Sequence, residues 1–186
     1  SGFGGLEHCR SCSMIYDRNG FKDRKKYVRL LSLVSHEFFH TWNIKRIRPE
    51  ELGPFDYYNE VYTKLLWIAE GVTSYYDNIF LPRCGVSTIK EYFKTICDDI
   101  RRYEGIPGKD VMTVEESSFD AWVKLYRPNE NSVNTSISYY LKGGLVVMAL
   151  DLTIRDLTDG QQSMDDVYRT LWTKFKDDSK GIDDAT

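Results

Sequence analysis

The chain has 186 residues, of which 41% are hydrophobic, 14% aromatic and 28% charged, a balance typical of one globular domain with a substantial core. The formal net charge of −3 argues against a general nucleic-acid binder. No apolar run approaches the roughly 20 residues that span a bilayer, so no membrane span is expected. The chain opens with Ser1-Gly2-Phe3 and has neither an initiator methionine nor a signal peptide, which predicts a fragment or a processed form.

Helical periodicity dominates the sequence after a short β segment at its N-terminal edge. Cys12 to Tyr16 is short and apolar enough for a strand. Apolar residues recur at steps of three and four from Asp23 to Lys45, and again from Glu60 to Phe80, which predicts two helices. Further helices are expected over 88–103 with Ser87 as N-cap, from Ser117 or Ser118 to Leu125, over 137–157, and from a capping box at 163–166 to Lys176. The fold class is therefore mainly α, with one domain over 1–176 and a frayed tail over 177–186.

The first long helix carries His36-Glu37-Phe38-Phe39-His40, an H-E-x-x-H motif that contains two of the three histidines in the chain. Residues four apart stack on one helix face, so both imidazoles can reach one metal ion, as in zinc sites. Glu37 is rotated by about 100° and would lie beside the metal, where it can take a proton from a metal-bound water. The alternative is a pair of core-facing histidines on an amphipathic helix.

Glu70 is a second unusual residue, because it follows Trp67-Ile68-Ala69 inside an apolar helical pattern. An unpaired buried carboxylate is costly, so a cation is expected to meet it. As a third metal ligand, Glu70 would leave the fourth place for water, as catalytic zinc requires. The alternative is a helix carboxylate that faces solvent.

Four cysteines are present: Cys9, Cys12, Cys84 and Cys97. Cys9 and Cys12 form a lone C-x-x-C without a second pair at zinc-ribbon spacing. We interpret them as free thiols or a packing feature, and a second metal or redox site is the alternative.

Four blocks along the chain extend beyond the zinc motif: Gly4–His8, His36–Pro49, Leu66–Tyr76 and Tyr139–Val146. In this order they resemble the glycyl aminopeptidase family of zinc metallopeptidases, which are often fused to a PDZ domain. That family is related to the aminopeptidase N family and shares its thermolysin-like catalytic core. The resemblance implies a helical, thermolysin-like catalytic domain, and a possible PDZ domain elsewhere in the full-length protein.

The resemblance also implies roles for particular residues. One zinc ion per chain would be held by His36, His40 and Glu70, with Glu37 as general base. Tyr140 would donate a hydrogen bond to the oxyanion, a role that suits a phenol. Tyr139 is adjacent and could be confused with it, and both could instead be packing tyrosines. Glu7, in a block similar to the edge strand of aminopeptidase N relatives, would bind the free α-ammonium of a peptide substrate; the alternative is an exposed glutamate near a chain end.

The implied function is a zinc-dependent aminopeptidase that releases small N-terminal residues (Gly or Ala) from peptides. Two alternatives are an inactive zinc-binding scaffold beside a PDZ domain and an endopeptidase on the same core. The sequence departs from the related enzymes in the longer spacing from His40 to Glu70, which predicts an insertion, and in lacking the family's long N-terminal β region. Ser74 also stands where thermolysin-type enzymes have an aspartate that orients a zinc histidine, so that support must differ here. The compartment, cytoplasmic or periplasmic, stays open.

Overall fold

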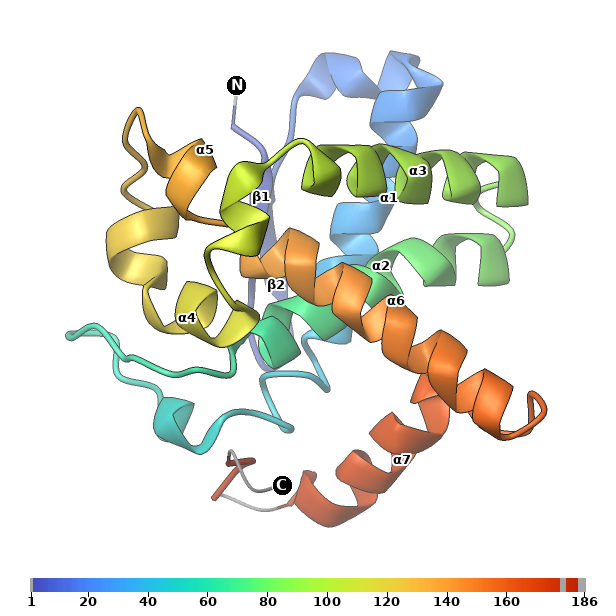
Figure 1. The fold of residues 1–186 in the computed structure, drawn as a ribbon. Helices are drawn as coiled ribbons and strands as arrows, with labels where there is room; N and C mark the ends of the chain where they lie inside the picture. The colour runs from blue at the N-terminus through green and yellow to red at the C-terminus, as the bar shows by residue number, and fades with distance from the viewer. Residues whose placement is uncertain (1, 178–179, 184–186) are drawn as a thin grey trace.

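The order of elements follows the helical pattern of the sequence after a short N-terminal hairpin (Figure 1). The computed structural model describes residues 2–177 and 180–183. The regular elements in that part are β1 (Gly4–Glu7), β2 (Cys12–Ile15), α1 (Arg24–Phe39), the π-helical turn η3 (Trp67–Gly71), α2 (Val72–Arg83), α3 (Ile89–Glu104), α4 (Val114–Phe119), the π-helical turn η5 (Ala121–Leu125), α5 (Ser132–Thr135), α6 (Tyr139–Leu157) and α7 (Met164–Phe175), with short 3-10 turns at η1 (Arg18–Lys22), η2 (Glu50–Leu52) and η4 (Pro107–Asp110).

The hairpin lies along the first long helix. β1 and β2 pair in antiparallel register, with Gly4 opposite Ile15 and Glu7 opposite Cys12, and β1 contacts α1. This confirms both the expected strand and the mainly α fold with a little β structure at its N-terminal edge. All four cysteines are free and exposed, which agrees with the interpretation of Cys9 and Cys12 as free thiols.

The first helix is shorter than its apolar pattern suggests. Its N-cap is Asp23, whose side chain accepts from the Lys26 amide at 2.8 Å, but the helix ends at Phe39 instead of Lys45. The chain then turns tightly, and Ile44 has a φ of +139°, which a β-branched residue adopts only when its surroundings enforce it. The apolar pattern therefore continues to Lys45, six residues beyond the end of the helix at Phe39.

The second helix also starts later than the pattern from Glu60 suggests. Residues 59–64 form no helix because their polar groups have long-range partners. Thr63 is buried and its hydroxyl donates to Glu51 at 3.2 Å, and the backbone oxygen of Val61 accepts from the Trp122 indole at 3.1 Å. Helical structure begins only at η3, which continues into α2.

The remaining helices lie close to their expected places. Thr88, not Ser87, caps α3, and Thr113 caps α4 several residues before the expected start at Ser117. Both caps are capping boxes with a glutamate three residues on, a signal that outweighs an isolated serine. The capping box at Ser163 is confirmed at the start of α7.

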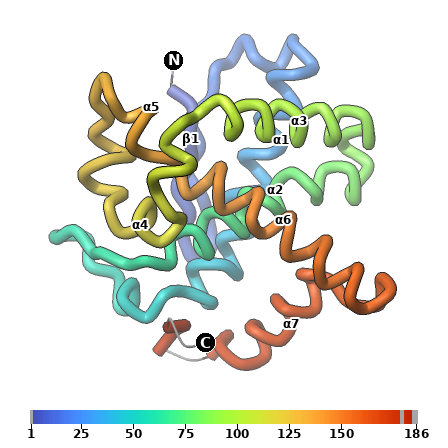
Figure 2. The backbone as a smooth tube through the Cα atoms, in the orientation of Figure 1, coloured from blue at the N-terminus to red at the C-terminus, as the bar shows by residue number. Residues whose placement is uncertain are grey.

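The core is aromatic and joins helices distant in sequence. Phe39 of α1 stacks on Tyr76 of α2 at a ring distance of 4.6 Å, and both rings contact Tyr168 of α7 at 5.7 Å. Figure 2 shows α6 crossing the molecule beside α2, and α7 turning back after it. This packing fixes α1 against α2, which continues directly from η3, so it positions the elements that carry the candidate site.

The structure bears on two further expectations, the frayed tail and the absence of a membrane span. The tail expected to fray over 177–186 lies partly outside the described residues, at 178–179 and 184–186. In its described part Ile182 is buried, and its amide and carbonyl oxygen bond to Arg48 and Glu50 at 2.8 and 2.9 Å.

Among the described residues, Ser132–Leu157 is also long and apolar enough to cross a membrane, with a mean hydropathy of 1.3. One such helix is weak evidence for a span: its apolar window is 33% buried, and α6 packs against η3 and α2.

Candidate metal centre

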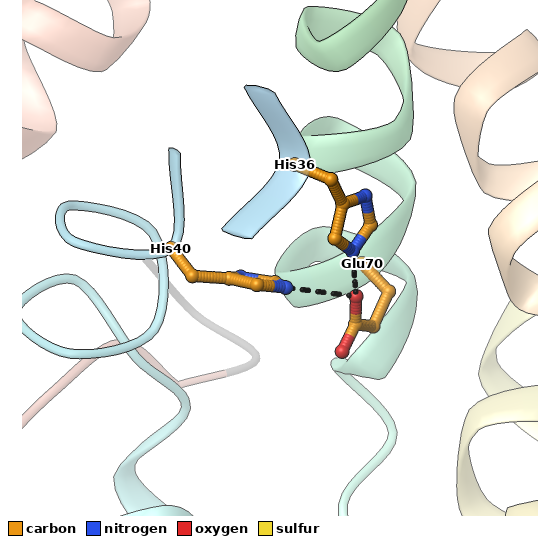
Figure 3. A group of neighbouring side chains, drawn as sticks. All are labelled: His36, His40 and Glu70. Carbon is orange, nitrogen blue, oxygen red and sulfur yellow. Dashed lines mark hydrogen bonds and ion pairs between the residues drawn. The ribbon is translucent and has the colours of Figure 1, made fainter. Parts of the chain in front are cut away.

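Three side chains from two elements converge on one point (Figure 3). His36 lies in the last turn of α1, His40 is the C-terminal cap of that helix, and Glu70 comes from η3. Nε2 of His36 and Nε2 of His40 lie 3.1 and 3.2 Å from the same carboxylate oxygen, Oε2 of Glu70. The structure therefore brings together the three residues that the sequence suggested as ligands.

The tautomer of each histidine follows from the hydrogen bond that its Nδ1 atom makes. If Nδ1 carries the hydrogen, Nε2 has a free lone pair that faces Glu70. Nδ1 of His40 lies 2.8 Å from the backbone oxygen of Asn43, an atom that can only accept, so Nδ1 carries the hydrogen. Nδ1 of His36 lies 2.9 Å from Oδ2 of Asp77, a carboxylate acceptor. In the neutral tautomers, both Nε2 lone pairs then point at a carboxylate. Three acceptors that converge in this way fit a cation, and two imidazoles with one carboxylate are a donor set that zinc favours.

Without a metal ion, this arrangement favours the protonated forms of the two imidazoles. Burial lowers the pKa of His36, but hydrogen bonds and charge from Asp77 and Glu70 outweigh it and raise that pKa to about 10. The pKa of His40 is also raised, because the Glu70 carboxylate outweighs its burial. Burial raises the pKa of Glu70, yet the two imidazoles hold it well below its usual range. Each of these shifts reflects a site where positive charge is favoured.

Glu37 lies beside the three converging side chains and is not one of them. It is buried, and burial raises the pKa of its carboxyl group. Its Oε2 has no hydrogen-bond partner among the described residues, a costly state for a buried carboxylate oxygen. An unpaired acceptor next to a three-ligand cluster is where a base would accept a proton from a water molecule.

A cavity of about 510 Å³ opens onto these groups. The edge of β1 forms one wall, and Gly5 runs so close to Glu37 that no side chain would fit between them. Tyr140 and Tyr126 form part of another wall. The cavity thus holds the candidate ligands, the candidate base, a strand edge and phenol groups together.

The two adjacent tyrosines of α6 have different places. Tyr140 lines the cavity, with its ring roughly parallel to that of His36 at 6.3 Å, whereas Tyr139 is buried. Burial and the charge of Glu70 raise the pKa of Tyr140 well above its usual range, so its hydroxyl stays protonated and can donate. The Tyr126 hydroxyl lies 3.5 Å from that of Tyr140. Of the pair, Tyr140 is the one placed to meet a ligand in the cavity.

Glu7 also lines the cavity, at the end of β1. Its Oε1 pairs with Nζ of Lys45 at 3.2 Å, and the Lys45 side chain is only 8% exposed. A half-buried carboxylate with a buried ionic partner is not an ordinary glutamate near a chain end. The pairing also means that any substrate ammonium would share Glu7 with Lys45.

Three supporting residues were missed by the reasoning from sequence. Asp77 accepts a hydrogen bond from Nδ1 of His36. In thermolysin-type enzymes this support comes from an aspartate at the position of Ser74. Tyr126 contacts Tyr140. Asn43 joins the two halves of the site: its backbone oxygen orients His40, and its side-chain amide donates to the carbonyl oxygens of residues 68 and 69, at 3.0 and 2.8 Å, directly before Glu70. The seven-residue step from Glu70 to Asp77 is the signal that was available, because it returns to within about 20° of the same helix face.

Comparison with known proteins agrees with this geometry. A family model described as M61 glycyl aminopeptidase matches residues 29–146, well over half of the chain. The chain belongs to the M61 glycyl aminopeptidase family. The matched range contains both histidines of the motif, Glu37, Glu70 and Tyr140, while the β1 strand with Glu7 lies outside it.

The fold of this M61 family member is also found in a solved structure. A crystal structure of an aminopeptidase N family protein from Idiomarina loihiensis matches with a TM-score of 0.94 and 39% sequence identity, over 100% of this chain and 32% of that chain. The chain thus spans about a third of that protein. No match is found among curated proteins.

Proposed function

We propose that this chain is the catalytic domain of a zinc-dependent peptidase, with its domain over residues 1–176. The observation that carries the proposal is the unpaired Oε2 of buried Glu37 beside the converging His36, His40 and Glu70. A structural histidine pair would need neither this orphaned carboxylate nor a cavity that opens onto it. Membership of the M61 family supports the same chemistry.

One zinc ion per chain would be held by Nε2 of His36, Nε2 of His40 and the Glu70 carboxylate. When bound, zinc lowers the pKa of a water molecule towards about 7 and polarises a carbonyl group. Asp77 and the backbone of Asn43 keep the two imidazoles in the ligating tautomer.

The residues of the chain then divide the work of peptide hydrolysis. Glu37 accepts a proton from the attacking water and passes it to the nitrogen of the leaving amine. The Tyr140 hydroxyl donates to the carbonyl oxygen as that oxygen becomes negative, a hydrogen bond that strengthens with the charge. β1 offers an exposed strand edge along which an extended peptide can lie.

We further propose that the enzyme is an aminopeptidase for peptides with small N-terminal residues. Glu7 would bind the free α-ammonium through a charge-assisted hydrogen bond, generally 1.5–3 kcal/mol. Because Lys45 already offsets part of the charge of Glu7, we expect the lower end of that range, about a tenfold preference for a free N-terminus. A PDZ domain elsewhere in the full-length protein would be a separate module.

Two alternative functions can be distinguished from the proposed one by experiment. A zinc-binding scaffold without turnover would bind metal and cleave nothing, although the presence of Glu37 and Tyr140 in the cavity favours an active enzyme. An endopeptidase would cleave acetylated and free peptides equally well.

The deciding experiment combines metal analysis with two variants. We expect the purified chain to hold one zinc ion by plasma emission and His36→Ala to lose it, while His8→Ala, which changes the exposed histidine outside the motif, retains it. Glu37→Gln should keep zinc and fold but lose nearly all turnover, because an amide cannot accept the proton. Full zinc content in His36→Ala would refute the ligand assignment. A preference of wild type for free over acetylated peptides that Glu7→Ala abolishes would identify the aminopeptidase.

A further inference from the structure

Charged side chains lie at both ends of the cavity of the candidate centre, an ion pair at one end and a single cation at the other. Glu7 and its partner Lys45 lie at one end, past His40 in the direction of the chain. Arg29 lines the other end, on α1 seven residues before His36, which is two helical turns or about 10 Å along the axis. Among the described residues that line the cavity, Arg29 is the only lysine or arginine.

Arg29 is the one cation of the cavity without an anionic partner among the described residues. Glu7 is paired with Lys45, and the carboxylates of Glu70 and Asp77 meet His36. The Arg29 side chain makes no ion pair or hydrogen bond within the part of the chain that the structure describes. Its guanidinium carbon lies 3.9 Å from the ring centroid of Phe3, the residue directly before β1.

This contact prepares the guanidinium for a planar anion. The cation–π contact with Phe3 limits the motion of the Arg29 guanidinium, and its N–H donors have no partner among the described residues. Two parallel N–H groups match the two oxygens of a carboxylate, the ligand that arginine binds best. The carboxylates of Glu7, Glu70 and Asp77 have partners of their own. The unpaired oxygen of Glu37 lies eight residues further along α1, at the candidate ligands. An anion for Arg29 would therefore come from a ligand.

We propose that Arg29, held by Phe3, is a subsite for the C-terminal carboxylate of a short peptide, so that the preferred substrates are tripeptide-sized. The inference rests on the proposed peptidase function. With the α-ammonium at Glu7 and the scissile carbonyl at the metal centre, the rest of the substrate runs toward Arg29. An extended chain advances about 3.3 Å per residue, so the carboxylate of a tripeptide lies roughly 7 Å beyond the scissile bond. The long Arg29 side chain covers the remaining distance.

The test measures binding without cleavage. Zinc-loaded Glu37→Gln chain is titrated calorimetrically with Gly-Ala-Ala and with the same peptide amidated at its C-terminus. We expect the free acid to bind about 3- to 10-fold more tightly, a modest factor because Arg29 is exposed, and the difference to shrink as salt is raised. Arg29→Gln should abolish the difference and Arg29→Lys should keep part of it. Lys25→Gln removes a positive charge one turn earlier on α1, outside the cavity, and should change nothing.

Equal affinity for the acid and the amide, no binding of either, or a difference that survives Arg29→Gln would each overturn the subsite. The proposed function fails separately. If wild type with zinc cleaves no peptide while the acid still binds more tightly through Arg29, the subsite stands and the peptidase assignment falls.

Discussion

Gly5→Ala is expected to remove most turnover while leaving zinc binding and the fold intact. Gly5 lies in β1 where the strand passes Glu37, opposite Met14 of β2. A Cβ atom at this position would lie 2.6 Å from Cγ of Glu37 and closer still to the carboxylate. Ordinary carbon contacts are about 3.5–4.0 Å, so the Glu37 side chain would have to move by about 1 Å or more.

The size of the effect follows from that displacement. The neighbouring atoms belong to the end of a flexible side chain, so the overlap is relieved by moving Glu37 and not by unfolding the strand. A misplacement of about 1 Å can cost 10²-fold in rate when a catalytic group must meet its proton at hydrogen-bond distance. We therefore expect kcat/KM to fall by about 100-fold, with a small change in melting temperature.

Gly4→Ala supplies the matched control, because a Cβ at the neighbouring position meets nothing within 4 Å. Both variants are assayed for turnover of a free-N-terminus peptide, zinc content and thermal unfolding. Only Gly5→Ala should lose activity, and both should retain one zinc ion. Wild-type activity in Gly5→Ala would refute the reasoning, since the base could then be displaced without consequence.

Three further predictions concern the ligand support, the tyrosine pair and pH. Asp77→Ala should weaken zinc binding by about 10- to 100-fold in a chelator competition, because it loses the acceptor that orients His36; unchanged affinity would contradict this. Tyr140→Phe should lower kcat by roughly 100-fold with little change in KM, and a larger loss in Tyr139→Phe would mean that the wrong tyrosine was assigned. In the metal-free chain the pKa of His36 is raised from 6.5 to about 10, so its stabilising contribution is full below pH 6.5 and is lost as the pH rises towards 10. The melting temperature of the metal-free chain should fall over that range, whereas the zinc-loaded chain should lack this decline.

Much of the site could be predicted because its signals are local. The four-residue step from His36 to His40 places both rings on one helix face wherever that helix packs. Together with the histidine motif, the apolar neighbours of Glu70 indicate a carboxylate that needs a cation. These arguments needed only helix geometry and the cost of burying charge.

The rest depended on contacts between distant segments. The end of α1 at Phe39 is set by the turn around Asn43, whose side chain bonds to η3 some 25 residues later, and no local propensity shows this. Asp77 was not predicted, because the sequence showed only that Ser74 stands four residues after Glu70 and that the support of the zinc histidine must differ there. Helix period alone allows either position, and the packing of α1 against α2 selects Asp77.

The position of Tyr140 relative to Glu70 depends on one close contact between the backbones of η3 and α6. A Cβ on Gly71 would lie 2.7 Å from backbone carbon of Gly143, and one on Gly143 would lie 3.0 Å from the Gly71 Cα, so neither position has room for a side chain. Gly71 directly follows the candidate ligand Glu70, and Gly143 lies three residues after Tyr140, about one helical turn. Because η3 and α6 meet here without intervening side chains, the hydroxyl of Tyr140 and the carboxylate of Glu70 reach the same cavity. The glycine pair thereby sets how near the proposed oxyanion donor Tyr140 stands to the candidate metal ligand Glu70, so these two glycines would contribute to the proposed mechanism although neither lines the cavity.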